Sequence, residues 1–108
     1  MKIPSGLRFT LTVDGKAHVV DVDAISARHV GELEMFFSIT PERVVTRLVG
    51  QEVTPLEAAA AVYLAERQAG RTPDPDELLD SITLGSSCEV TFEGEVLPSL
   101  GRDADPNS

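Results

Sequence analysis

The chain has very little of the chemistry on which most catalytic and metal sites depend. Its 108 residues include no tryptophan, one cysteine and two histidines. A disulfide needs two thiols, so Cys88 cannot form one within the chain. His18 and His29 lie in different predicted elements without a nearby cysteine, so neither has the spacing of metal ligands. Because a glycine-rich phosphate loop and a serine nucleophile elbow are also missing, we predict a protein that is not an enzyme and holds no metal or cofactor.

Positive charge and long apolar runs are also scarce. The sequence has 9 basic and 18 acidic residues, a formal net charge of -9, which repels nucleic acid and anionic lipid. No segment approaches the roughly 20 apolar residues of a membrane span. The opening MKIPSGLRF has no apolar run of secretory length. We therefore expect a cytosolic protein that binds neither nucleic acid nor a membrane.

The N-terminal part has the pattern of a β-hairpin. Apolar residues alternate strictly with polar ones along its first run, at Leu7, Phe9, Leu11 and Val13. Asp14-Gly15 follows, and this pair readily supplies the two positive φ angles of a type I′ turn. A second β-rich run comes next, and the turn would place Phe9 opposite Val20. One face of the hairpin is apolar and needs a cover.

Helices are the predicted cover, because the later apolar residues have helical spacing as far as residue 82. Three helix starts carry a capping residue before a proline, at Thr40-Pro41, Thr54-Pro55 and Asp74-Pro75. Thr54 and Glu57 also have the spacing of a capping box, and Gly50 and Gly70 are expected as left-handed residues at helix ends. The predicted helices cover 26–37, 41–49, 55–69 and 75–82. The fold class is therefore α+β, a β-hairpin covered by about four short helices.

The C-terminal part divides at residue 93. In CEVTFE, Cys88, Val90 and Phe92 alternate with polar residues, which indicates a third strand and a buried Cys88. We predict a single domain over residues 1–93. Residues 94–108 contain turn formers and acids with little to bury, so we expect a mobile acidic tail.

The third predicted helix differs from the others because its middle is apolar all round. Residues 58–65 read AAAAVYLA, without a charge, an amide or a glycine. Such a helix is surrounded, so we place it at the centre of the domain. Its neighbours could all come from this chain, or one side could be an interface with another chain. Both environments select the same residue types, so both interpretations stay open here.

Arg43 and Arg47 lie one helical turn apart on the second predicted helix. They could form a small positive spot that contacts an acidic partner. Alternatively they are ordinary solvated arginines, which contribute little.

Read in order, four segments resemble the small tail assembly chaperones of long-tailed phages that infect actinobacteria. The segments are FTLTVDGKAHVVDVD, VGELEMFFSITPERVV, AAVYLAERQAG and TPDPDELLDSI. The family pattern has an "ELE" helix, then a helix with small residues, an aromatic residue, a leucine and an arginine, then a short acidic helix. Its counterparts here are Glu32-Leu33-Glu34, Ala61-Val62-Tyr63-Leu64, Arg67 and the segment 74–79.

The resemblance implies a non-enzymatic chaperone in the cytoplasm of an infected bacterial cell. Such proteins coat the tape measure protein, help to recruit tail tube subunits and are absent from the finished particle; a longer, frameshifted form is typical. We expect the partner surface on the first and third helices. The candidate partner-binding residues are Phe36, Phe37, Arg43, Arg47, Leu48 and Tyr63. Whether the chain forms a homo-oligomer is left open.

A small structural virion protein is the alternative. In a head–tail or tail adaptor, the hairpin and the central helix would form a ring interface between subunits. Such a protein would remain in the particle.

Overall fold

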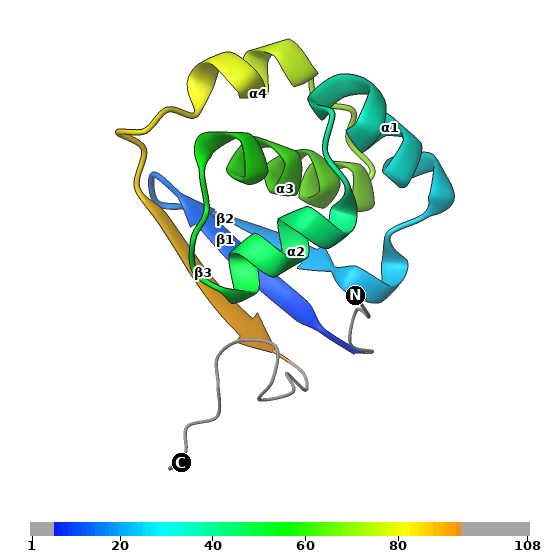
Figure 1. Cartoon of the computed structure of the whole chain (residues 1–108), viewed down its shortest axis with the longest axis horizontal. Coiled ribbons are helices and arrows are strands. Elements are labelled where there is room, and N and C mark those ends of the chain that lie inside the picture. The colour runs from blue at the N-terminus through cyan, green and yellow to red at the C-terminus, as the bar shows by residue number, and fades with distance from the viewer. Residues whose placement is uncertain (1–5, 94–108) are drawn as a thin grey trace.

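A three-stranded antiparallel sheet carries all four α-helices on one of its faces (Figure 1). The computed structural model describes residues 6–93. In chain order the elements are β1 (Arg8–Val13), β2 (Lys16–Asp21), the short 3-10 helix η1 (Val22–Ala24), α1 (Ala27–Phe37), α2 (Pro41–Val49), α3 (Pro55–Gln68), α4 (Pro75–Ser81) and β3 (Cys88–Glu93). The α+β prediction is confirmed, and every predicted helix boundary lies within one residue of the observed one. The predicted tail, 94–108, lies outside the described residues.

The β1–β2 hairpin forms as its turn residues predict. Asp14 and Gly15 both have positive φ, at 50° and 86°, and Phe9 pairs with Val20. The turn is also tied to the residue that precedes β3. The backbone N–H of Asp14 donates to the carbonyl of Ser87 at 2.8 Å, and the Ser87 N–H donates to Asp14 Oδ1 at 2.9 Å. The hairpin thereby holds the start of the third strand.

The third strand pairs with β1, so the sheet order is β2-β1-β3. Phe9 pairs with Phe92, and their rings meet edge to face with centroids 6.3 Å apart. The predicted strand is confirmed, but the predicted burial of Cys88 is wrong, because its side chain is exposed. The reason is position: α3 packs over β1 and β2, and Cys88 lies at the start of β3, on the opposite side of β1 from β2.

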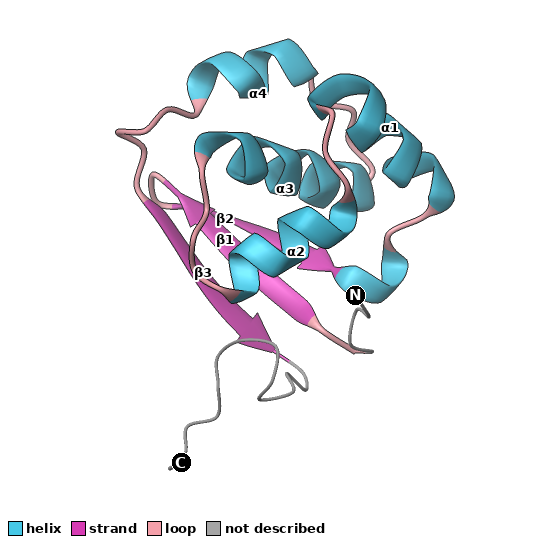
Figure 2. Ribbon diagram, viewed as in Figure 1, coloured by secondary structure: helices cyan, strands magenta, loops and turns pink. Residues whose placement is uncertain are grey.

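Helix α3 occupies the centre of the domain, between the sheet and α4 (Figure 2). Its residues 57–65 are all buried, including the whole of AAAAVYLA. Contacts come from β1, β2, α1, α2 and α4, so neighbours within this chain surround the helix. Of the two interpretations of its apolar middle, the structure confirms the first.

The helix ends follow the predicted caps with one exception. The Thr54–Glu57 capping box is present, and Gly70 is left-handed with φ 89°. The prediction for Gly50 is wrong, because that residue keeps a helical conformation with φ -79°. Gln51 takes the left-handed conformation instead, with φ 59°. Its N–H donates to the Leu48 carbonyl at 3.1 Å, which closes α2 one residue later than expected.

Candidate functional site

The structure divides the six candidate partner-binding residues between core and surface. Phe37, Leu48 and Tyr63 are buried, with exposed fractions of 4%, 0% and 2%. They therefore belong to the core and cannot be surface anchors in this fold, which corrects the expectation drawn from their size and position. An apolar stripe along a helix marks the face that turns toward the core, and in this fold that face packs against other elements of the same chain. Phe36 is different, with 39% of its surface exposed.

Three of the candidates form one aromatic cluster. The ring of Tyr63, on α3, meets Phe36 at a centroid distance of 5.9 Å and Phe37 at 5.5 Å, both edge to face. Such pairs add roughly 0.5–1.5 kcal/mol beyond the burial of their area. Two consecutive residues of α1 thus pack against one residue of α3, and Phe36 is the member of the cluster that also faces solvent.

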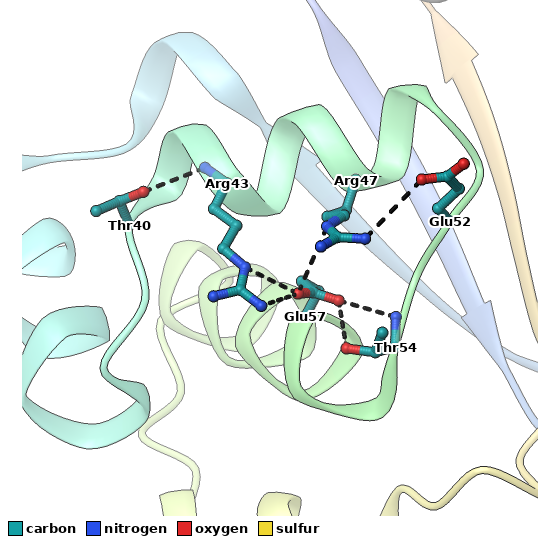
Figure 3. A network of polar contacts seen from close by, with 6 residues as sticks. All are labelled: Thr40, Arg43, Arg47, Glu52, Thr54 and Glu57. Atoms are coloured by element: carbon teal, nitrogen blue, oxygen red, sulfur yellow. Dashed lines mark hydrogen bonds and ion pairs between the residues drawn. The ribbon is translucent and has the colours of Figure 1, made fainter.

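The two candidate arginines point toward a buried carboxylate (Figure 3). Glu57, in the first turn of α3, has no exposed surface. The guanidinium of Arg43 donates to Glu57 Oε2 from Nε and lies 3.1 Å from it through Nη2, and Arg47 Nε lies 4.0 Å from the same oxygen. Thr54 serves the other oxygen: its N–H donates to Oε1 at 2.8 Å, and its hydroxyl donates as well. Glu57 therefore joins α2 to the start of α3.

Electrostatics keep this carboxylate charged. Burial alone would raise the pKa of Glu57, but the hydrogen bonds from Thr54 and the charges of Arg43 and Arg47 outweigh it and hold the pKa below its usual value. The arginine side chains are 49% and 40% exposed, and Arg47 also lies 3.9 Å from Glu52. The positive spot predicted on α2 is thus largely neutralised by acids of this chain.

A second network joins α1 to α3 around Glu32. Tyr63 donates its hydroxyl proton to Glu32 Oε1 at 2.9 Å. The guanidinium of Arg67 spans both carboxylate oxygens, with Nε 3.1 Å from Oε1 and Nη2 3.3 Å from Oε2. The hydrogen bond from Arg67 is the main cause that lowers the pKa of Glu32, and the bond from Tyr63 adds to it against the opposing effect of burial. For Tyr63, burial and then Glu32 raise the pKa, so its hydroxyl remains a donor.

A third polar group ties β2 to the C-terminal end of α3. His18 is only 8% exposed, and its Nδ1 lies 3.6 Å from Glu66 Oε2. Arg71 donates to the same carboxylate. Burial lowers the pKa of His18, although Glu66 opposes that effect. His18, Glu66 and Val62 line a cavity of about 290 Å³, to which Leu78 and Ser81 of α4 also contribute.

The roles of Glu32 and His18 were not predicted from the sequence, and for Glu57 only the capping box with Thr54 was predicted, not the contacts with Arg43 and Arg47. For His18 a signal existed, because it alternates with Val20 and so belongs to the inward face of β2. The contacts of the two glutamates with arginine side chains had no such signal. Their partners come from other helices, and only the tertiary fold brings them together.

Metal and membrane features can be assessed for the described residues only. Between residues 6 and 93, no three His, Cys, Asp or Glu side chains gather closely enough to hold a metal ion. None of the helices in this range combines the length and apolar character of a transmembrane span. For the exposed Cys88, desolvation and the nearby Asp14 carboxylate raise the pKa, so its thiol is mainly protonated at neutral pH.

Comparison of the chain with protein families, with curated proteins and with solved structures finds no match. Function must therefore be inferred from the residues and their arrangement.

Proposed function

We propose that this protein is a non-enzymatic tail assembly chaperone of a long-tailed phage. In the cytoplasm of the infected cell it binds the tape measure protein and assists the assembly of tail tube subunits. The observation that supports the proposal best is the meeting of Glu32, Tyr63 and Arg67 in one hydrogen-bonded network.

These three residues carry two separate parts of the family resemblance. Glu32 belongs to the "ELE" segment, whereas Tyr63 and Arg67 belong to the alanine-rich segment, 31 positions or more further along the chain. A chance likeness between short degenerate segments would not require their residues to touch. Their contact gives the segments a shared physical purpose, the docking of α1 against α3, and so supports treating them as one pattern.

The surface of α1 suits a chaperone. Met35 and Phe36 are 73% and 39% exposed on a chain whose net charge is -9. Such a module stays soluble through its charge while it presents apolar side chains to a partner. A long, helical tape measure protein would expose amphipathic helices that aggregate unless covered, and a helix that packs its apolar face on another protein is a common mode of recognition.

The alternative, a structural virion protein, has less support. Its proposed ring interface used the central helix, yet residues 57–65 of α3 are buried within this chain. A ring built on that helix would require the domain to open.

Mass spectrometry of infected-cell lysate and of purified virions tests the proposal. A chaperone should give peptides of this chain in the lysate and none at stoichiometric level in the particle. Peptides that continue past Ser108 would identify a longer form and strengthen the proposal. Stoichiometric presence in the particle would overturn it and favour the structural alternative.

A further inference from the structure

A groove runs between η1, α1 and the start of α2. It has a volume of about 360 Å³, near the lower end of the range typical of ligand pockets. We call it the α1–α2 groove. Its lining residues are Val22, Ile25, Val30, Glu34, Thr40, Pro41 and Glu42.

The lining is apolar with an acidic edge. Val22 and Pro41 are buried and Ile25 and Val30 are half-buried, so apolar atoms remain accessible inside the groove. Every charged residue of the lining is acidic, namely Glu34 and Glu42. The cavity of about 290 Å³ at α4 differs, because Lys16 and His18 lie beside its acids.

The negative charge at this edge is not neutralised by the described part of the chain. Within residues 6–93, neither Glu34 nor Glu42 forms an ion pair with a basic side chain. Arg43 and Arg47 lie on the same helix as Glu42, but their guanidinium groups point toward Glu57 (Figure 3). The buried carboxylate therefore draws the positive charge of α2 away and leaves the groove acidic.

We infer that the α1–α2 groove binds a basic amphipathic helix of the partner protein. An apolar side chain of that helix would enter between Ile25 and Val30. Lysine or arginine residues one turn before and after it would pair with Glu34 and Glu42, because helix positions three or four apart share a face. The inference rests on the proposed function, since it assigns the partner's contact and the chemistry of the contacting segment.

Fluorescence anisotropy with two labelled model helices tests the inference. Both peptides have about 18 residues, five helical turns, and the same leucine-rich face; one has a lysine-rich polar face and the other a glutamate-rich one. The folded full chain should bind the basic peptide and discriminate against the acidic one. Glu34→Lys with Glu42→Lys should weaken the basic peptide at least about tenfold and reverse the preference.

A matched control separates the groove from net charge. Asp80→Lys with Glu89→Lys makes the same change in charge at two exposed positions on α4 and β3. This variant should bind the basic peptide within about twofold of the wild type. Val30→Trp, which fills the groove without changing charge, should weaken both peptides, and circular dichroism should show that each variant is folded.

Three results would overturn the inference. The first two are equal binding of both peptides to the wild type and an equal loss of affinity for the basic peptide in the Asp80/Glu89 control variant. The third is a dimer in sedimentation that Val30→Trp dissociates, because a second copy of the chain would then occupy the groove. Co-expression with the tape measure protein separates this inference from the proposed function. If the wild type fails to keep the tape measure soluble, the proposed function fails while the peptide result stands. If the wild type and the Glu34/Glu42 variant keep it soluble equally well, the function stands and the groove assignment fails.

Discussion

Glu57 ties the central helix α3 to α2 and Glu32 ties it to α1, yet they do so in different surroundings. Both accept hydrogen bonds from arginine side chains. The Glu57 side chain is completely buried, while its arginines are 49% and 40% exposed. The side chains of Glu32 and Arg67 are exposed to a similar, smaller extent, 21% and 19%. One network is therefore a buried anion with cations at its edge, and the other is an evenly half-buried pair.

The difference shows that an ion pair cannot be valued from its distance alone. The shortest contacts between arginine and carboxylate are 3.1 Å in both networks. An uncompensated charge costs most where water cannot reach it. Removing the arginines should therefore reduce the free energy of unfolding more at Glu57. Removing either Glu32 or its partner Arg67 should reduce it less.

The largest effect is expected when the Glu57 network loses both cations. Arg43→Met with Arg47→Met should reduce the free energy of unfolding by about 3 kcal/mol at pH 7, because a buried carboxylate is left without a counter-charge. The value lies at the lower end for buried pairs, since the half-exposed arginines leave space that water can enter. Urea denaturation measures it. A loss below about 1 kcal/mol would mean that the arginines are not needed to keep Glu57 charged.

A smaller effect is expected when the anion itself is neutralised. Glu57→Gln should reduce stability by about 2 kcal/mol at pH 7, because hydrogen bonds to a charged group are replaced by neutral ones. The pKa of Glu57 is lower in the folded protein than its ordinary value of 4.5, so its stabilisation is present above that pH and is lost as the pH falls through the folded value. Unfolding curves for the two proteins should therefore converge below about pH 4.5. A gap that persists in acid would show that the effect of the substitution is steric.

Removing one hydrogen bond from the Glu32 network should have a still smaller effect. Tyr63→Phe keeps the aromatic contacts with Phe36 and Phe37 and removes only the donor to Glu32. We expect a loss of about 1 kcal/mol in thermal or urea unfolding. A loss as large as that of Glu57→Gln would remove the contrast between the two networks.

The smallest effect concerns His18, which is buried but lies beside Glu66. Its pKa is lowered by burial, so the unfolded chain binds the proton more readily than the folded one. The contribution of His18 to the free energy of unfolding should therefore be fully present above its ordinary pKa of 6.5. It should decline as the pH falls from there toward the lower pKa of the folded protein. His18→Asn should remove this decline in a series of unfolding curves between pH 8 and pH 5. If the stability of the wild type instead rises as the pH falls from 8 to 5, the attraction of Glu66 for the protonated His18 outweighs the effect of burial.

The elements could be predicted because their signals are local. Thr54 and Pro55 fix the start of α3 within a few residues of chain, and Asp14-Gly15 fixes the hairpin turn. The environment of Glu57 could not be predicted in this way. Its position next to a helix start is typical of a solvated acid, and its burial depends on how α2 packs across it.

The candidate site was harder to predict than the fold for the same physical reason. Leu48 and Tyr63 have the size and helical position of interface anchors, and core residues have the same properties. Cys88 alternates like a buried strand residue, but it lies at the start of β3, beyond the two strands over which α3 packs. The α1–α2 groove has no continuous sequence signal, because three elements contribute its residues.

The pairing of β1 with β3 has a consequence for the order in which the protein forms. Arg8 is in register with Glu93, and Val13 with Cys88, so the first and last described strands are neighbours in the sheet. The hairpin and the hydrogen bonds within each helix join residues close in sequence, but this ladder closes nearly the entire described chain into a loop. Proteins dominated by such distant pairings fold more slowly than helical ones. During synthesis, therefore, the edge of β1 that pairs with β3 stays open until residue 93 has emerged, and any chain that follows is attached to a domain whose sheet has only just closed.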